Sequence, residues 1–315
     1  MRPDALLPRG VQVLERGWLS CNNIVLQGDG EGSAVVDSGY YLHSEQTLAL
    51  VRQALGGRPL DFLWNTHLHS DHCGGNAALQ TAYPDVDTAI APGQAEAVRN
   101  WCPQTLGYLP TGQHCPPFRY DRLMTPGQTL QLGHQRWQVH AAPGHDPHAV
   151  LLFDPANSLL IAADALWENG FGVVFPELDG QDAFDSVAAT LDLIAALEPK
   201  VVIPGHGKVF ADVPLALERA RKRLDYFVQR PARHRNYAAK VLLKFRLLEL
   251  QQVQCAALLS WAATTPYMRS LWQRFHADTT LEAYVMDLLE QLIRAGAAGR
   301  EGTLLINQDD VARLA

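Results

Sequence analysis

The sequence is sparing in cysteine and has no long apolar run. Five cysteines are spread over 315 residues, and none of them forms a CxxC pair. This odd, widely spaced set argues against a disulfide framework or a structural zinc knuckle, and it favours reduced thiols in a cytoplasm. No run reaches the roughly 18 apolar residues that a membrane span needs, and the N-terminus has no hydrophobic leader. We therefore expect a cytoplasmic protein without a membrane partner.

Charged residues are also few, at 19%, whereas hydrophobic residues make up 47%, enough for a full core. The net charge of −7 argues against a nucleic-acid binder as a whole. The charge is unevenly spread, however. Residues 1–211 carry 11 Lys/Arg and 22 Asp/Glu, a net of −11, and residues 212–315 carry 15 and 11, a net of +4. This split predicts two domains, residues 1–211 and residues 212–315.

The first domain alternates short apolar segments with helical ones. The apolar segments predict strands at Val11–Leu14, Asn23–Leu26, Ala34–Val36, Asp61–Asn65, Thr88–Ile90, Thr129–Leu132, Arg136–Ala141, Ala149–Phe153, Leu159–Ala162 and Val201–Ile203. Helical spacing predicts helices at His43–Leu55, Gly75–Ala82 and Asp182–Leu197. Between them, Trp101–Arg122 is rich in Pro, Gly and aromatics, which predicts a long surface loop of the kind that often contacts substrate.

The sequence of the second domain predicts a mainly helical structure. Helices are predicted at Leu215–Arg230, Ala232–Leu250, Val253–Ala263 and Leu281–Ala295, with Thr279 and Glu282 as a capping box for the last of them. The turn Gly299-Arg300-Glu301-Gly302 between short apolar pieces predicts a hairpin. Several helices closed by a hairpin indicate a winged-helix-like module.

A dense cluster of metal-ligand residues, His67-Leu68-His69-Ser70-Asp71-His72, follows the predicted strand Asp61–Asn65. His67, His69 and Asp71 occupy alternate positions, and in extended backbone alternate side chains point the same way. We therefore expect these three to converge, with His72 turned to a neighbouring point. Imidazole and carboxylate are ligands of zinc, iron and manganese.

Three further ligand-type residues follow later strands. They are His145 in Ala142-Pro143-Gly144-His145, Asp164 in Ile161-Ala162-Ala163-Asp164 and His206 in Pro204-Gly205-His206-Gly207. Each stands on a predicted strand-end loop, where active sites of layered α/β folds collect. One such residue could be an ordinary loop residue, but three in succession favour a shared metal site.

The four motifs in this order resemble the metallo-β-lactamase superfamily, and Val35-Val36-Asp37-Ser38-Gly39 resembles the strand–Asp–Gly turn of that family. The resemblance covers about residues 11–210. It implies an αββα metallo-β-lactamase sandwich, here with a smaller, mainly helical, winged-helix-like C-terminal domain. By position, it implies that His67, His69 and His145 hold one metal. It implies that the other is held by Asp71, His72 and His206, with Asp164 bridging.

Such a site implies a hydrolase. Two divalent ions, with zinc preferred over iron or manganese, would share a water as a bridging hydroxide and polarise the scissile bond. Asp71 is the candidate catalytic residue, because it can orient the nucleophile or accept its proton. Metal-bound imidazoles need a second acceptor, for which Asp37 is a candidate. The common zinc β-lactamases have Cys where this chain has Asp164. The resemblance therefore favours glyoxalase II-like, RNase Z-like, lactonase-like or alkylsulfatase-like relatives over antibiotic hydrolysis.

Several neighbouring residues have two readings each. Trp167 and Phe171 either line the pocket or pack in the core, and Cys73 fits a small packing residue better than a ligand. His148 contacts substrate or lies in a supporting position. Lys208 either pairs with an anionic substrate or is solvated.

The preferred function is hydrolysis of a small ester, thioester or lactone. The C-terminal part does not resemble the glutathione-binding tail of glyoxalase II, which argues against that particular thioester. A second hypothesis is a single-strand endoribonuclease, because the C-terminal pattern is similar to the winged helix of β-lactamase-like endoribonucleases. A basic stripe there could bind RNA or be solvated; it comprises Arg219, Arg221, Lys222, Arg223, Arg230, Arg233, Arg235, Lys240, Lys244 and Arg246. A mononuclear iron persulfide dioxygenase and a non-enzymatic, metal-stabilised binding module are further alternatives. A homodimer is left open.

Overall fold

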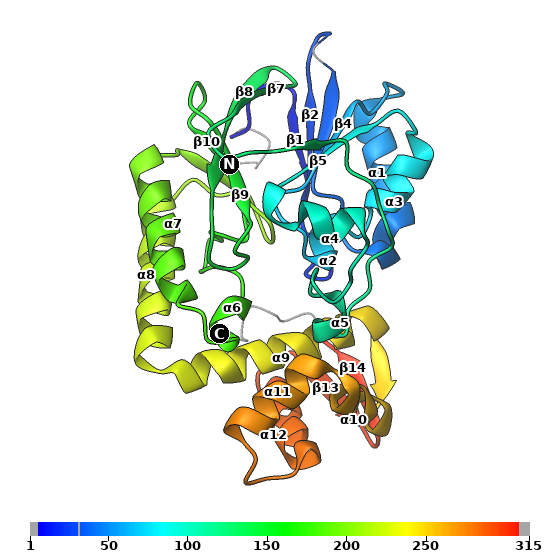
Figure 1. The fold of residues 1–315 in the computed structure, drawn as a ribbon, viewed down its shortest axis with the longest axis vertical. Coiled ribbons are helices and arrows are strands. Elements are labelled where there is room, and N and C mark those ends of the chain that lie inside the picture. Colours follow the sequence, from blue (N-terminus) through cyan, green and yellow to red (C-terminus); the bar gives the residue numbers. More distant parts are fainter. Residues whose placement is uncertain (1–5, 31, 309–315) are drawn as a thin grey trace. The chain divides into compact units, whose positions relative to one another are not determined.

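The computed structural model describes residues 6–30 and 32–308. The chain forms two compact units. The first comprises Met1–Leu106 and His114–Tyr226, and the second comprises Gly107–Gln113 and Phe227–Ala315. The predicted domains, residues 1–211 and 212–315, stay a prediction about which parts fold independently. Figure 1 shows the elements of both units.

The first unit contains a six-stranded sheet whose strands follow one another in chain order. The first three strands pair antiparallel and the remaining pairs are parallel. The strands are β1 (Val11–Leu14), β2 (Asn23–Gln27), β3 (Ser33–Val36), β4 (Phe62–Trp64), β5 (Asp87–Ile90) and β6 (Arg122–Leu123). The parallel pairs place the ends of β3, β4 and β5 at the same edge of the sheet.

The second sheet of this unit has five strands in the order β11-β10-β9-β8-β7. All neighbours are antiparallel except β10 and β11, which are parallel. The strands are β7 (Thr129–Leu132), β8 (Gln135–Ala141), β9 (Val150–Asp154), β10 (Leu159–Ala163) and β11 (Val201–Pro204).

The main core lies between the two sheets, because alternate side chains of each strand point to opposite faces. Ile24 and Leu26 of β2 belong to one buried cluster with Leu152 of β9 and Ile161 of β10. Val25, between the two β2 residues, belongs instead to a second cluster on the outer face. Burial of each such side chain contributes about 1.5–3 kcal/mol to folding.

Helices cover both outer faces, which completes the αββα order (Figure 1). On α1, Leu48, Val51 and Leu55 pack against the outer face of the first sheet, and the helix ends at Gly56 with φ +60°. In Figure 1, α7 lies on the opposite side, beside the second sheet. The helical segments of this unit are η2 (Tyr41–His43), α1 (Ser44–Leu55), α2 (Ser70–Cys73), α3 (Asn76–Ala82), η3 (Pro92–Gln94), α4 (Ala95–Arg99), α6 (Phe175–Leu178), α7 (Ala183–Leu197) and α8 (Val213–Gln229), whose last three residues belong to the second unit.

The second unit has a winged-helix-like order of elements. They are α5 (Tyr108–Thr111), α9 (Pro231–Leu250), β12 (Gln252–Gln254), α10 (Cys255–Thr264), α11 (Pro266–Phe275), α12 (Leu281–Arg294), β13 (Ala298–Glu301) and β14 (Leu304–Asn307). The predicted hairpin is confirmed as β13 and β14, and β12 joins it in a three-stranded antiparallel sheet. The fold class expected from the sequence is therefore confirmed.

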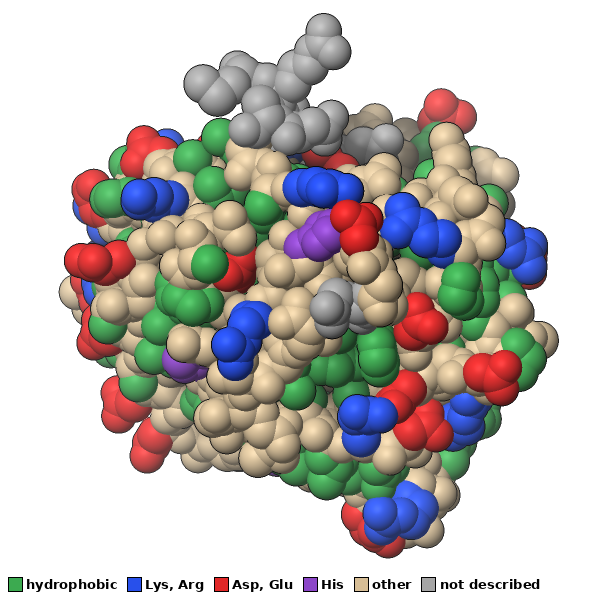
Figure 2. Space-filling view, turned by 90° about the horizontal axis from the view of Figure 1, so that it is seen from above, with side chains coloured by type: hydrophobic (Ala, Val, Ile, Leu, Met, Phe, Trp, Pro, Cys, Tyr) green, Lys and Arg blue, Asp and Glu red, His purple; other side chains and the backbone are tan. Residues whose placement is uncertain are grey.

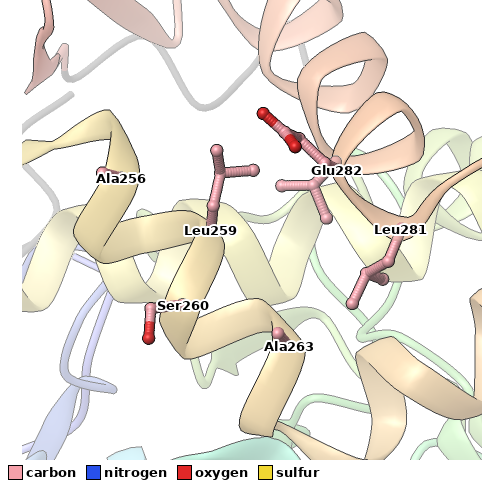
Figure 3. A pocket seen from close by; sticks show the side chains of 7 residues that line it. Ala256, Leu259, Ser260, Ala263, Leu281 and Glu282 are labelled. Atoms are coloured by element: carbon pink, nitrogen blue, oxygen red, sulfur yellow. The ribbon is translucent and has the colours of Figure 1, made fainter.

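A shallow pocket of about 370 Å³ lies between α10 and α12 of the second unit (Figure 3). Its lining is apolar except for Ser260 and Glu282; the other residues are Ala256, Leu259, Ala263, Leu281 and Val285. A single carboxylate in such a lining offers no set of metal ligands.

Three local predictions were wrong. The segment Val253–Ala263 is not one helix, because β12 takes its first residues and α10 begins at Cys255. The cap of α12 is Thr280, whose hydroxyl accepts from the backbone N–H of Ala283. The loop Trp101–Arg122 is not all surface, since Tyr108 and Cys115 within it are buried.

The molecular surface has charges of both signs on the face that is shown. On the face in Figure 2, acidic and basic side chains are interspersed, and neither sign gathers into one area. Among the described residues, every helix is too short or too polar to cross a bilayer.

Candidate metal centre

Seven ligand-type residues come together at one edge of the first unit, and they come from both sheets. His67 and His69 follow β4, and Asp71 and His72 lie in the short helix α2. The remaining three stand in loops after strands of the second sheet: His145 after β8, Asp164 after β10 and His206 after β11. The side chains form two clusters, in each of which the ligand atoms lie within 4.8 Å of one another.

The first cluster comprises His67, His69 and His145. Nε2 of His67 lies 3.1 Å from Nδ1 of His69. The Nδ1–H of His145 donates to the carbonyl oxygen of Val173 at 2.5 Å, which leaves its Nε2 with a free lone pair. The cluster thus presents imidazole nitrogens toward one point.

The second cluster comprises Asp71, His72, Asp164 and His206. Nε2 of His206 lies 3.1 Å from Oδ2 of Asp71 and 3.9 Å from Oδ2 of Asp164. Nε2 of His72 lies 3.5 Å from Oδ1 of Asp164. Oδ2 of Asp164 is also 3.4 Å from Nε2 of His145, so this carboxylate lies between the two clusters.

The donor set fits divalent metal ions. Nε2 of His72 and Nε2 of His145 are both buried, and neither has a hydrogen-bond partner among the described residues. An unsatisfied buried nitrogen is costly unless something fills its place. Nε2 of His72 lies 3.5 Å from Oδ1 of Asp164, Nε2 of His145 lies 3.4 Å from Oδ2 of Asp164, and neither contact is a hydrogen bond. Imidazole and carboxylate donors in this number suit zinc, iron or manganese.

Electrostatics favour the ligand forms of His67, His145 and Asp164. Burial is the main cause that lowers the pKa of His67 well below its usual value and that of His145 to about 4. Both imidazoles are therefore neutral at pH 7, as metal ligands must be. Burial alone would raise the pKa of Asp164, but His72 and His206 lower it well below its usual value. Asp164 is therefore a carboxylate.

A match between the sequence and a protein-family model identifies the superfamily of the protein that contains this centre. Residues 16–206, more than half of the chain, match the model of the metallo-beta-lactamase superfamily, and this stretch contains all seven residues.

The chain belongs to the metallo-beta-lactamase superfamily.

Curated relatives support this assignment. The chain is 30% identical to a hydroxyacylglutathione hydrolase of Acidiphilium cryptum over 204 residues, which cover 64% of the chain and 71% of the relative. It is 33% identical to the enzyme of that name from Rhodobacter capsulatus over 162 residues, 50% of the chain and 54% of the relative. The chain thus spans about half to seven tenths of the length of the curated relatives that it matches.

A solved superfamily structure has the same fold over nearly the whole chain. It is a metallo-beta-lactamase family protein from Thermus thermophilus, 21% identical, with a TM-score of 0.57. The match covers 96% of this chain and 100% of the other. The predicted superfamily, its fold and the enzyme class, a hydrolase, are therefore confirmed.

The superfamily motif His67–His72 does not run extended throughout, as the alternation argument assumed. His69 is extended, with φ −65° and ψ 148°, but it is the N-cap of α2, and Asp71 is helical. The prediction that Asp71 converges with His67 and His69 was therefore wrong. The helical turn carries Asp71 to the second cluster, in agreement with what the resemblance implied.

Backbone detail at β10 and β11 aims Asp164 into the site. The β10–β11 register shifts between Ile161 and Ala163, and Ala163 has φ +45° immediately before Asp164. A left-handed alanine is strained, and such strain is common at functional sites. A Cβ on Gly205 would lie 2.2 Å from Oδ1 of Asp164, so only glycine lets the β11 loop approach this carboxylate.

Asp37 supports the second cluster, as predicted. Its Oδ2 accepts from Nδ1 of His72 at 2.8 Å, which directs Nε2 of that ring into the site. Oδ2 of Asp37 also accepts from the hydroxyl of Thr66 at 2.7 Å, and Oδ1 accepts from the Thr66 backbone N–H at 2.9 Å. Cys21, buried beside Asp37 and His72, escaped prediction because no spacing links it to either motif.

Half-buried aromatic rings flank the centre. The ring of Trp18 stacks on His206 at 5.3 Å and 6°, and Trp167 meets the same imidazole edge-on at 5.6 Å. Phe175 stands edge-on to His69 at 6.0 Å. Of the two aromatics considered from the sequence, Trp167 thus lies at the site, whereas Phe171 is fully buried. Trp18 and Phe175 were missed because an isolated aromatic carries no motif.

Of the remaining candidate residues from the sequence, one is buried and two are exposed. Cys73 is buried, with its Sγ 3.8 Å from Sγ of Cys115, which supports the packing interpretation. His148 and Lys208 are exposed.

Proposed function

We propose that this chain holds two divalent metal ions in the two clusters and hydrolyses a small thioester, ester or lactone. The observation that carries the proposal is the meeting of a three-imidazole cluster with a four-residue cluster at Asp164, whose Oδ2 lies 3.4 Å from His145 and 3.9 Å from His206. The second cluster supplies enough donors for an ion of its own, which favours a dinuclear centre over a mononuclear iron site.

When bound, divalent ions supply Lewis acidity and lower the pKa of water. The chain's own residues would hold and orient the reactants. Burial raises the pKa of Asp71, but the hydrogen bond to His206 and the charge of His72 outweigh it, and the net pKa is lowered. A lowered pKa keeps Asp71 ionised at neutral pH, which suits a ligand and hydrogen-bond acceptor that orients the nucleophile. It suits less well a strong general base, whose pKa should lie near the working pH.

The flanking aromatics support a substrate with an apolar portion. Trp18 and Trp167 lie beside the second cluster and Phe175 beside the first, and each is half-buried. Apolar walls with a few polar groups are typical of small-molecule sites. The relatives named hydroxyacylglutathione hydrolase make a thioester of a small acyl group the first substrate class to test.

The endoribonuclease hypothesis receives less support. In α8, Arg219 donates to the Asn169 side chain at 3.0 Å, Arg221 pairs with Asp192 at 2.8 Å, and Lys222 pairs with Glu218. These cations of the basic stripe are engaged within the first unit. Helix α12, directly before the hairpin, has three acidic residues, Glu282, Asp287 and Glu290, and one basic residue, Arg294. Its net negative charge repels phosphates.

Elemental analysis followed by a substrate panel tests the proposal. The purified protein is expected to hold about two metal ions per chain and to turn over thioesters, esters or lactones faster than RNA or persulfides. Asp164→Ala should lose the activity, whereas Asp225→Ala, an exposed acid on α8, should keep it. Full activity in Asp164→Ala, or oxygen uptake with persulfides at one iron per chain, would contradict the proposal.

A further inference from the structure

Trp167 contacts the carboxylate that lies between the two clusters. It stands three residues after Asp164 in the loop that follows β10, and its indole Nε1–H donates to Oδ1 of Asp164 at 3.1 Å. The ring is held edge-on by Trp18 at 5.3 Å and by His206 at 5.6 Å. The indole therefore has one defined position relative to the carboxylate.

The two oxygens of Asp164 have different surroundings. Oδ1 accepts from the indole, lies 3.5 Å from Nε2 of His72, a member of the second cluster, and packs against Gly205. Oδ2 faces one member of each cluster, Nε2 of His145 at 3.4 Å and Nε2 of His206 at 3.9 Å. A partial rotation of the carboxylate about its Cβ–Cγ bond would carry Oδ2 out of its position between His145 and His206, and the indole hydrogen bond to Oδ1 opposes that rotation.

We infer that Trp167 is a positioning residue that fixes the plane of Asp164, so that Oδ2 is the oxygen shared by the two metal sites. This inference rests on the proposed dinuclear function. In this view the indole N–H, and not the face of the ring, keeps the carboxylate of Asp164 from turning toward one cluster alone.

The loop that carries Trp167 is built to keep this geometry. The backbone N–H of Trp167 donates to the carbonyl of Gly170 at 2.7 Å, and that of Gly172 donates to the carbonyl of Asp164 at 2.9 Å. Arg219 of α8 donates to the Asn169 side chain at 3.0 Å. Past this turn, the carbonyl of Val173 accepts from His145. One loop thus makes hydrogen bonds both to a ligand of the first cluster and to the carboxylate between the clusters.

The alternative is that Trp167 serves only as an aromatic wall. Substitution by Phe separates the two roles, because it keeps a ring beside Trp18 and His206 and removes the N–H donor. Trp18→Phe is the matched control, since Trp18 stacks on the same His206 ring and its described contacts are ring contacts without a hydrogen bond to Asp164. Trp167→Gln gives the converse change, an N–H donor without the ring.

The experiment titrates metal-free protein with Zn²⁺ against a chromophoric chelator, and records the EPR spectrum of the Mn²⁺-loaded form for coupling between the ions. Loss of a residue that orients a metal ligand typically weakens metal binding by about 10–100-fold. We expect a loss of that size for one of the two Zn²⁺ ions in Trp167→Phe, together with weakened coupling between manganese ions. Trp18→Phe should stay within about threefold of wild type, and Trp167→Gln should bind more tightly than Trp167→Phe.

The outcomes separate the two claims. If wild type takes up a single ion, the proposed dinuclear function is wrong and the inference falls with it. If wild type takes up two ions and Trp167→Phe matches Trp18→Phe in affinity and EPR coupling, only the inference is wrong. It is also wrong if Trp167→Gln binds no more tightly than Trp167→Phe, because a restored N–H donor would then not restore metal binding. Thermal unfolding of each metal-free variant verifies that it is folded.

Discussion

Nδ1 of His72 lies 2.8 Å from Oδ2 of Asp37, and both side chains are almost fully removed from solvent. Within the part of the chain that the structure describes, the carboxylate accepts three hydrogen bonds, one from this imidazole and two from Thr66. A carboxylate suits this position because every contact that it makes here is with a donor.

Asp37→Asn should therefore weaken the second metal site. The amide nitrogen would face a donor wherever it points, so the His72 ring would lose its fixed orientation. We expect metal binding to weaken by about 10–100-fold at one of two ions, measured by chelator competition. Thr66→Val removes a hydroxyl donor but leaves the His72 contact, and it should have a smaller effect. Equal affinities in Asp37→Asn and wild type would show that this hydrogen bond does not orient the ligand.

Acid should destabilise the metal-free protein in part through His145. Burial lowers the pKa of this side chain to about 4, whereas in the unfolded chain it is about 6.5. Between these pH values the unfolded state binds a proton that the folded state does not, so the free energy of unfolding falls as the pH falls. The full effect is about 3 kcal/mol, reached near pH 4.

His145→Asn isolates this contribution, because an amide N–H can still donate to Val173 but does not titrate. Chemical unfolding in the presence of EDTA from pH 7.5 to 4.5 gives the comparison. Wild type should lose stability relative to the variant as the pH falls through 6.5. His72, whose pKa is raised, has the opposite pH dependence, but it is present in both proteins and cancels. A difference that does not change with pH would contradict the assignment.

Removal of the Thr280 hydroxyl should loosen the start of α12. Its Oγ1 accepts from the backbone N–H of Ala283 at 3.1 Å, and an N-cap of this kind is worth about 1 kcal/mol. Thr280→Ala should speed amide exchange at Ala283 about fivefold, the equivalent of that free energy. The adjacent Thr279 donates to the His276 carbonyl instead, so Thr279→Ala should leave this amide unchanged. If Thr279→Ala speeds exchange at Ala283 and Thr280→Ala does not, Thr279 is the N-cap after all.

Cys102 should be the first thiol to react with iodoacetamide. It is half-buried, and hydrogen bonds, above all with the Thr105 hydroxyl, lower its pKa. The other four cysteines are buried, and burial raises the pKa of Cys21 to about 11. Mass spectrometry at pH 7.5 should find alkylation of Cys102 roughly tenfold faster or more than that of any other cysteine. Cys102→Ser should remove the early adduct, and its persistence would assign the reactivity elsewhere.

The strands and the meeting of the ligand-type residues could be predicted from the sequence because each carried a short-range signal. Val11–Leu14 and Thr129–Leu132 have the predicted bounds, since apolar runs between Gly, Asp and Pro mark strand ends. All seven ligand-type residues meet in two clusters, because each stands beside a strand end and the strand ends share an edge. That they bind metal remains a proposal.

What the sequence could not supply depends on contacts between distant segments or on a local change of backbone. The chain turns from extended to helical between His69 and Ser70, and no residue there marks the change. Trp18 and Trp167 meet at His206 only through the packing of three loops. Helix α11 was missed for a different reason: Pro266 was not recognised as its first residue, a position that proline favours.

The site takes ligands from both sheets, and its members stand far apart in the chain; Asp71 and His206, 3.1 Å apart at their side chains, are separated by 135 positions. During synthesis, the histidine cluster after β4 leaves the ribosome long before β11 exists to receive it. A nascent or truncated chain that stops before His206 therefore carries most of the donors without the finished centre. Tight metal uptake should accordingly come late, as a property of the closed sandwich, and it should then oppose the separation of the two sheets.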